Sequence, residues 1–273
     1  MSFTRINANL SALASYNELL KTNRTVSKGL LRLSSGKRIN SVGDDPAGFS
    51  LARSIESRRR SLSQALRNVE TAKNVLSIAE GGYLAIAGIL QVIKEKAVQA
   101  ADDSYNPDQK AAIQGQIDAL ISEIDDIVEE TEFQGTMLID GSLANAVFQT
   151  GAAAGDVFSV SLSDADSAAL SVNALYVSDA GSASQAIYDV DDAINTLNVA
   201  AQRVGEYMLR LDNKEQTLAI AVANIEATRS RIEDADFAKE QMDLIRSQII
   251  QQTGFAAFGQ ANAAPQLVLS LFA

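Results

Sequence analysis

The chain has 273 residues, a net charge of −11 and no Cys, His or Trp. These absences exclude disulfides, a thiolate nucleophile, Cys- or His-based metal centres and a histidine general base. Of the remaining reactive side chains, none forms an acid–base pair or a phosphate-binding loop at a recognisable spacing. We therefore expect no enzyme, and we assign no catalytic, cofactor-binding or metal-binding residue.

The charge is distributed unevenly. Residues 1–60 contain eleven Lys or Arg but four Asp or Glu, so this arm is basic and the remainder is strongly acidic. A basic arm can indicate nucleic-acid binding. Here the charges alternate with an apolar stripe, which favours pairing with acidic parts of the same chain or of a neighbouring copy. No apolar run approaches the ~20 residues of a membrane span, and residues 1–7 lack the apolar core of a secretory signal peptide.

Residues 6–33 have the spacing of a short heptad helix. Polar Asn17, Arg24 and Ser27 interrupt its seam, which lowers stability but can fix register. A helix of this length is marginal alone, so we expect it to be loose in the monomer and to become ordered on assembly. Its apolar anchors are Ile6, Leu10, Leu13, Leu20, Leu30, Leu31 and Leu33.

A second helix is predicted from Pro46 to about Ala101, with Asp45 as its N-cap and Pro46 at its first position. Gly81 and Gly82 mark a tight crossing or a soft point, because each costs about 1 kcal/mol relative to Ala. Its seam positions are all apolar: Leu62, Ala65, Val69, Ala72, Leu76, Ala79, Tyr83, Ile86, Leu90, Ile93, Ala97 and Ala100.

A third helix starts at Asn106 and Pro107 and ends before a turn at residues 133–135. The short link over 102–106 makes it antiparallel to the second helix. Residues 145–151 and 156–162 are rich in β-branched and aromatic side chains around a Gly-containing link, which predicts a β-hairpin. The buried face of the third helix is expected at Ile113, Ile117, Leu120, Ile124 and Ile127.

A very long helix is predicted from residue 183 toward Gly254, roughly 70 residues or about 100 Å. Its apolar residues recur with a strict seven-residue period, and a stripe with this period stays on one face of a helix only if the helix supercoils with partner helices. It continues through Met242, Ile245 and Ile249, with a slip between Ala235 and Ala238. Its first twelve seam positions are apolar except Glu215: Ile187, Val190, Ile194, Leu197, Ala201, Val204, Met208, Leu211, Glu215, Leu218, Val222 and Ile225.

These patterns predict a mainly α fold, an elongated antiparallel helical coiled-coil rod with a small β-hairpin region and paired N- and C-terminal helices. Residues 1–42 with 230–273 form a terminal coiled-coil module, and residues 43–229 form a helical rod with the hairpin. The apolar faces left on the terminal helices should be buried against other copies, because an apolar chain end left in water is unusual. The expected interface residues are Ile6, Leu10, Leu13, Leu20, Leu31, Arg58, Arg59, Ile232, Met242, Ile245, Ile249, Leu267, Leu271 and Phe272.

Several segments, in order along nearly the whole chain, resemble the terminal signatures of bacterial flagellins. Near the N-terminus these are INANL at 6–10, LSSGKRIN at 33–40 and GDDPAG at 43–48, and in the middle EFQG at 132–135 with LIDG at 138–141. Near the C-terminus they are SRIEDADFAKE at 230–240, then QAN at 260–262 and PQ at 265–266. The large variable outer domain that many flagellins insert is missing, and about 40 residues fill its place.

The resemblance implies a subunit that self-assembles into the flagellar filament for motility. It implies export through the flagellar type III apparatus without a cleaved signal peptide, an export chaperone on residues 230–273, and contact with the filament cap and junction proteins. The terminal module would form the inner tube of the filament and the remainder the outer tube. A hook–filament junction protein is the alternative, and a nucleic-acid binder a more distant one.

Some flagellins are sensed by Toll-like receptor 5 through an Arg-rich segment and a nearby acid. Here Val92, Lys94 and Lys96 stand where the family pattern has Arg, Arg and Leu, Glu95 is kept, and Gln116 stands near the acid. Since Lys does not replace Arg at a stacked or bidentate contact, we expect weak or no recognition.

Three charged groups have two interpretations each. Arg58, Arg59 and Arg60 could bind a polyanion, but an intersubunit or solvated face is favoured. The paired acids Asp44 with Asp45 and Asp125 with Asp126 could be metal ligands, but two adjacent acids cannot complete an oxygen cage, so capping and surface roles are favoured. Glu215 is either a register device or pairs with Lys or Arg across the seam, and pairing is favoured.

Overall fold

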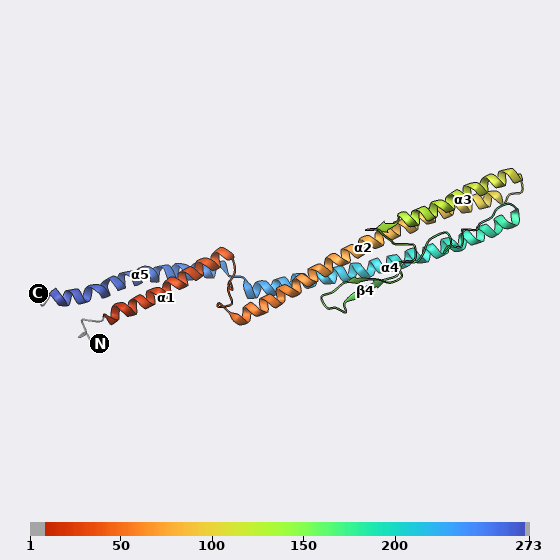
Figure 1. Cartoon of the computed structure of the whole chain (residues 1–273). Helices are drawn as coiled ribbons and strands as arrows, with labels where there is room; N and C mark the ends of the chain where they lie inside the picture. Colours follow the sequence, from red (N-terminus) through yellow and green to blue (C-terminus); the bar gives the residue numbers. More distant parts are fainter. Residues whose placement is uncertain (1–8, 271–273) are drawn as a thin grey trace. The chain divides into compact units, whose positions relative to one another are not determined.

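The structure, a computed structural model, describes residues 9–270, with side chains to residue 263 (Figure 1). The described chain contains α1 (Leu10–Ser35), α2 (Pro46–Ala100), α3 (Pro107–Glu130), β1 (Glu132–Phe133), β2 (Thr136–Met137), β3 (Ala146–Gln149), β4 (Val157–Val160), α4 (Ala180–Glu233) and α5 (Phe237–Ser270). The prediction of a mainly α chain with a small β region is confirmed. Two compact units are present: unit 1 comprises residues 1–57 and 224–273, and unit 2 comprises residues 58–223.

In unit 1, α1 packs antiparallel against α5, so the predicted pairing of the terminal helices is confirmed (Figure 1). The side chain of Asn9 caps α1 by accepting a hydrogen bond from the Ala12 N–H. The helix ends at Gly36, whose φ of 70° is the left-handed conformation that Gly adopts without steric cost. Asp45 then accepts the Gly48 N–H at 2.9 Å and starts α2, as the sequence predicted.

The prediction of a single helix from residue 183 toward Gly254 is wrong. The chain leaves the helix after Glu233 and re-enters it at Phe237, at the slip in the seam. The N–H of Ala235 bonds to the Gly36 carbonyl at 2.9 Å, and the N–H of Arg38 bonds to the Glu233 carbonyl at 2.7 Å. These bonds replace helical ones, and the side chain of Asp236 caps the new helix through the Lys239 N–H.

In unit 2, α2 and α4 are antiparallel, because Lys73 pairs with Glu215 at 2.8 Å while Lys94 pairs with Asp191 at 2.5 Å. All twelve predicted seam residues of α2 are buried, none more than 8% exposed. On α4 five of the predicted seam residues are buried. The remaining buried positions include Ala186, Ala193 and Ala200, each one residue before a predicted seam position, and these small side chains allow the helices to approach closely. The buried α4 residues are Ala183, Ala186, Val190, Ala193, Leu197, Ala200, Val204, Leu211 and Leu218.

The third predicted helix is confirmed as α3, with a capping box between Asn106 and Gln109. Of its predicted buried face, Ile113, Ile117 and Ile124 are buried, but the prediction is wrong for Leu120 and Ile127, because Ile121 and Val128, one residue later, are buried instead. Helix α3 runs beside the second half of α2 (Figure 1). It begins shortly after α2 ends, and Thr131, the residue that follows α3, lies against Gly82 of α2. The helix passes through Gly81 and Gly82 without interruption. A Cβ on Gly82 would lie 2.8 Å from Thr131 Oγ1, so this Gly marks a tight crossing.

The predicted hairpin is confirmed as β3 and β4, an antiparallel pair with Phe148 opposite Phe158. The Phe158 ring is buried, with Tyr207 against it edge-on and the Arg210 guanidinium 4.6 Å from its centre. Two β-elements were not predicted: the two-residue ladder of β1 and β2, and an isolated bridge between Lys37 and Asp234.

An irregular segment over residues 161–177 completes the core of unit 2. Ser163 accepts the Tyr83 hydroxyl at 2.5 Å, the Ser167 N–H donates to Asp125 at 2.8 Å, and the Val177 N–H donates to Gln114 at 2.8 Å. This segment therefore lies along α2 and α3. It buries Leu162, Ala165, Leu170, Val172, Leu175 and Val177.

The expectation that no segment is apolar enough to cross a membrane needs one correction. An 18-residue window of α2 has a mean hydropathy of 1.6, which suits a membrane span by length and composition. The apolar stripe of α2 is packed inside unit 2, and core helices of many proteins have the same composition.

Candidate assembly surface

Helix α1 carries two heptad seams on different faces. The seam that contacts α5 buries Ala12, Leu19 and Val26, each seven residues from the next. The other seam is the apolar pattern seen in the sequence, and it is exposed in the single chain. It contains Leu10, Leu13, Leu20 and Leu31.

Helix α5 repeats this division. Its inner face toward α1 follows Glu240, Leu244, Ser247, Gln251, Gly254 and Phe258, in alternating steps of four and three. Its apolar stripe, predicted at Met242, Ile245 and Ile249, points away from α1 and is exposed. The exposed stripes, as named here, comprise Leu10, Leu13, Leu20 and Leu31 on α1 with Met242, Ile245 and Ile249 on α5; their exposure is 36–65%.

The inner seam combines a few buried apolar side chains, Leu19, Val26 and Leu244, with small and polar ones. A Cβ on Gly29 would lie 3.4 Å from Leu244 Cδ1, and one on Gly254 would lie 3.4 Å from Leu19 Cδ1. These glycines let the two backbones approach closely. The more hydrophobic faces of both helices are thus left without a partner inside the described chain.

The remaining predicted interface residues are placed as follows. Ile232 is half-buried and Arg58 is exposed, whereas Arg59 is half-buried and engaged in contacts. Leu267 lies in α5 beyond the last described side chain, and Ile6, Leu271 and Phe272 lie outside the described residues. The interface role of the whole set stays a prediction.

Exposed apolar side chains also occur where the heptad pattern did not predict them. Phe237, Ile250 and Phe255 on α5 are each at least half exposed, and they lie outside the seam that was followed in the sequence. In the sequence, these residues could have been noticed only as large apolar side chains outside the apolar stripe of the same helix.

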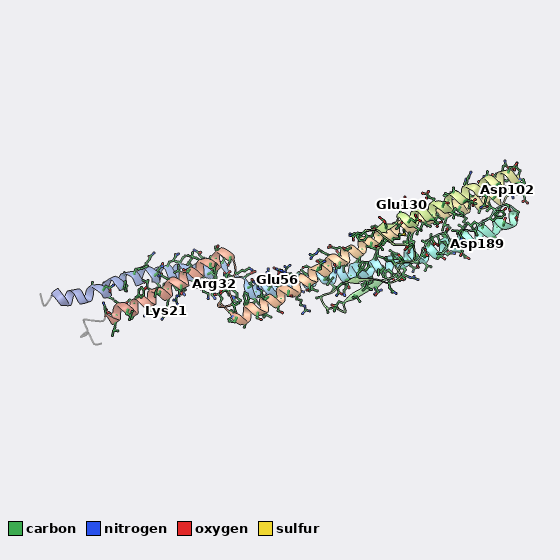
Figure 2. All side chains as sticks on the ribbon, viewed as in Figure 1. Lys21, Arg32, Glu56, Asp102, Glu130 and Asp189 are labelled. Carbon is green, nitrogen blue, oxygen red and sulfur yellow. The ribbon has the colours of Figure 1, made fainter. Side chains whose placement is uncertain are left out.

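Part of the basic charge of the N-terminal arm is paired within unit 1. Lys28 contacts Asp44 at 2.6 Å, Arg32 contacts Glu240 at 3.0 Å, and Lys37 contacts Glu233 at 2.7 Å. Figure 2 labels Arg32 on α1. The hydrogen bond from Lys28, with those from the Ser41 and Asn40 N–H groups, holds the pKa of Asp44 well below its usual range. The favoured interpretation, charge pairing within the protein, is confirmed for these residues.

The other acids singled out in the sequence also have structural partners. Asp125 accepts hydrogen bonds from the N–H and hydroxyl of Ser167, and Asp45 caps α2. Glu215 reaches Lys73 across the seam, so the pairing interpretation is confirmed. The hydrogen bonds that the Lys73 ammonium donates to the carboxylates of Asp212 and Glu215 raise the pKa of Lys73. Within residues 9–270, no three acidic side chains converge as metal ligands would.

Comparison with known proteins agrees with this arrangement of paired terminal helices. Residues 6–144 match the bacterial flagellin N-terminal helical region, and residues 187–272 match the bacterial flagellin C-terminal helical region. Flagellin FlaB2 of Treponema pallidum (strain Nichols) and the flagellar filament 33 kDa core protein of Treponema phagedenis are each 33% identical, over 97% of this chain and 99% of their own. The flagellin of Bacillus subtilis (strain 168) is 34% identical over 98% of this chain and 99% of its own.

Two solved structures share the fold. The crystal structure of Bacillus cereus flagellin aligns with a TM-score of 0.51 and 25% identity, over 56% of this chain and 88% of its own. A putative flagellar hook-associated protein from Vibrio parahaemolyticus aligns with a TM-score of 0.60 over 70% of this chain and all of its own, but at 13% identity this likeness shows the fold alone. Because two flagellin regions together match most of its length, the chain belongs to the bacterial flagellin family.

Proposed function

We propose that this flagellin is a structural subunit of the flagellar filament, and that it polymerises by burying the exposed stripes of α1 and α5 against other copies of the same chain. The observation that carries this proposal is the exposure of seven apolar side chains on two well-formed helices. Complete burial of a Leu, Ile or Met contributes about 1.5–3 kcal/mol. A monomer leaves most of that gain unrealised, and neighbouring copies supply the missing partners.

A filament subunit is favoured over a hook–filament junction protein. The relatives that span nearly the whole chain are flagellins and filament core proteins. The hook-associated likeness concerns the fold alone. We expect the purified chain to polymerise by itself, whereas a junction protein would stay monomeric or short.

The test replaces Ile245 in the middle of the α5 stripe. Ile245→Asp places a charge in the proposed interface, where its burial without a partner is costly. Polymerisation, followed by sedimentation and electron microscopy, should be abolished, while the circular dichroism of the monomer stays unchanged. Ile245→Val is the matched control and should polymerise. Normal filaments from Ile245→Asp would refute the role of this stripe.

The finer assignments follow from family membership. Residues 1–42 and 230–273 form the inner tube and residues 43–229 the outer tube, since the former contain the exposed stripes and the latter the buried α2 seam. The chain is not an enzyme and takes no cofactor, because the family is one of structural proteins. Deleting residues 235–273 should abolish filaments and leave the α2 core folded.

Export partners are expected on the same helix. The chain is exported unfolded through the flagellar type III apparatus without a cleaved signal peptide, with an export chaperone on residues 230–273, and it meets the filament cap and junction proteins at the filament ends. The exposed α5 stripe supports the chaperone site, since an amphipathic helix binds through such a face. Co-purification that survives Ile249→Asp would contradict a chaperone site on this stripe. Neither nucleic-acid binding nor membrane insertion is part of the proposal.

Recognition by Toll-like receptor 5 should be weak or absent. Lys94 is held by Asp191 at 2.5 Å, and Val92 carries no donor. The stretch therefore lacks the fixed guanidinium fork that a planar contact requires. Restoring Arg at positions 92 and 94 and Leu at position 96 should raise a receptor-reporter signal above that of the parent; a strong signal from the parent would contradict the prediction.

A further inference from the structure

The inner seam between α1 and α5 contains two polar pairs at separate levels. The Gln251 amide donates to Asn23 Oδ1 at 2.5 Å, and both residues are partly buried. Arg32 Nη1 donates to Glu240 Oε1 at 3.0 Å, with the two side chains 24% and 12% exposed. Among the described residues Arg32 Nε is buried and has no hydrogen-bond partner, so this ion pair is not optimised for stability.

Two features besides the polar pairs also belong to the observed register: Gly29 faces Leu244 and Gly254 faces Leu19, and backbone bonds join residues 36–38 to 233–235 where the two helices begin and end. Along α1, Leu19 and Val26 recur at seven residues, and the α5 positions that face them recur at the same interval. A slip of seven residues would keep this repeat but place Leu19 opposite Ser247 instead of Gly254. The seven-residue repeat by itself therefore does not select one register.

The polar pairs remove this degeneracy. In the observed register the Tyr16 ring lies tilted against that of Phe258 with ring centres 6.0 Å apart, and Asn23 meets Gln251 one heptad further on. A slip of seven residues would place Asn23 against Leu244 in one direction or against Phe258 in the other. Either slip leaves the Asn23 amide without its polar partner, which is costly at a partly buried position.

We infer that Asn23 with Gln251 and Arg32 with Glu240 are positioning pairs that, together with the backbone bonds at residues 36–38, fix the register of α1 on α5 and so decide which exposed side chains face the next copy together. The inference rests on the proposed polymerisation. A slip of one heptad would shift the α5 stripe by about 10 Å along α1. The stability of the pair is then secondary to its alignment, as for a polar residue in a coiled-coil seam.

The absence of Cys from the chain allows a direct measurement of register. Leu19→Cys combined with Gly254→Cys reports the observed register, because these two positions are in contact. Leu19→Cys with Ser247→Cys reports a one-heptad slip. In the parent full-length chain we expect the first disulfide and little of the second, before and after polymerisation.

The decisive variant is Asn23→Leu with Gln251→Leu. A purely structural pair predicts tighter packing in the same register. A positioning pair predicts that the slipped disulfide rises about tenfold relative to the parent, equivalent to losing ~1.4 kcal/mol of discrimination, and that filaments become short or irregular. Asn17→Leu with Gln252→Leu, at exposed positions, is the matched control for cross-linking and should keep the parent register.

A charge exchange tests the second pair. Arg32→Glu and Glu240→Arg should each increase the slipped disulfide and impair polymerisation, and the double exchange should restore both. If the double-leucine variant keeps the parent register and forms normal filaments, the inference is overturned. A parent chain that shows the expected disulfide but never polymerises would refute the proposed function instead, because the two measurements are independent.

Discussion

The two units use the same heptad pattern with opposite outcomes. In unit 2 the twelve seam residues of α2 are at most 8% exposed, so the helix finds all its partners within the chain. In unit 1 the exposed stripes of α1 and α5 remain 36–65% exposed, and the helices pair through a different, more polar face. An apolar heptad thus predicts that a helix needs a partner, but not whether that partner belongs to the same molecule.

The sharpest test of this comparison is one truncation in each unit. Ile86→Ala in the α2 seam should lower the free energy of unfolding of unit 2 by about 2–5 kcal/mol, because it leaves a cavity in a closed core. Ile249→Ala on the α5 stripe should leave monomer stability within about 0.5 kcal/mol and weaken polymerisation. Since the units can unfold separately, hydrogen exchange resolved by residue is the appropriate measurement.

Leu84→Ala provides the control within α2. Leu84 is 61% exposed, two residues from Ile86, and its truncation should cost far less than that of Ile86. Equal losses at positions 84 and 86 would show that the stripe is not the core of unit 2. A large monomer loss from Ile249→Ala would show that unit 1 is as self-sufficient as unit 2.

The neighbouring glycines of α2 give a second test with opposite signs. Gly82→Ala should destabilise unit 2 by about 1–3 kcal/mol, because its Cβ would lie within 3 Å of Thr131 Oγ1 and Ile139 Cδ1. Gly81→Ala meets no atom within 4 Å and should stabilise the helix by up to about 1 kcal/mol. Thermal unfolding of the two variants checks the contrast, and the same sign for both would contradict the tight crossing at Gly82.

Alkaline pH should act on unit 2 through Tyr83. Burial raises the pKa of Tyr83 to about 12, although its hydrogen bond to Ser163 opposes the shift. The folded pKa lies above the usual value near 10, so the stability from neutral Tyr83 is complete below pH 10 and is lost as the pH rises toward 12. Tyr83→Phe should cost about 1 kcal/mol at pH 8 and should remove this alkaline loss in pH-dependent melting.

Acidic pH should act on unit 1 through Asp44, with the smallest effect. The pKa of Asp44 is lowered chiefly by the hydrogen bond from Lys28. The stability that it contributes is therefore complete above pH 4 and is lost as the pH falls below that value. Asp44→Asn should cost about 1 kcal/mol at pH 7, since Lys28 is partly exposed. If the stability of unit 1 falls equally below pH 4 in the parent and in Asp44→Asn, other carboxylates cause that loss.

The sequence predicted the parts of the fold that repeat locally. The α2 stripe, the cap at Asp45, the capping of α3 by Asn106 and the β3–β4 hairpin all depend on residues close in the chain, and the structure confirms them. The break after Glu233 depends instead on backbone bonds to residues 36–38, which no local pattern reveals. The segment over 161–177 has no period at all, and its burial depends on the surfaces of α2 and α3.

The candidate surface was predictable in one respect and hidden in another. The stripes of Leu13 and Ile245 were visible because they are apolar and periodic. The seam that joins α1 to α5 was not, because its members Asn23, Gln251 and Gly254 interrupt the apolar heptad. The second seam has a single apolar residue per heptad on α1, at Ala12, Leu19 and Val26, which is weaker than the apolar stripe beside it, so only the tertiary structure identifies it.

The backbone bonds between residues 36–39 and 233–235 have a mechanical consequence. Two segments that are distant in the sequence are tied together by the bonds of Ala235 to Gly36 and of Arg38 and Ile39 to Glu233. Neither segment can extend or twist by itself without breaking these bonds. A twist of one helix about its axis is therefore transmitted to both segments together. Residues 36–39 and 233–235 act as one joint and not as two independent hinges.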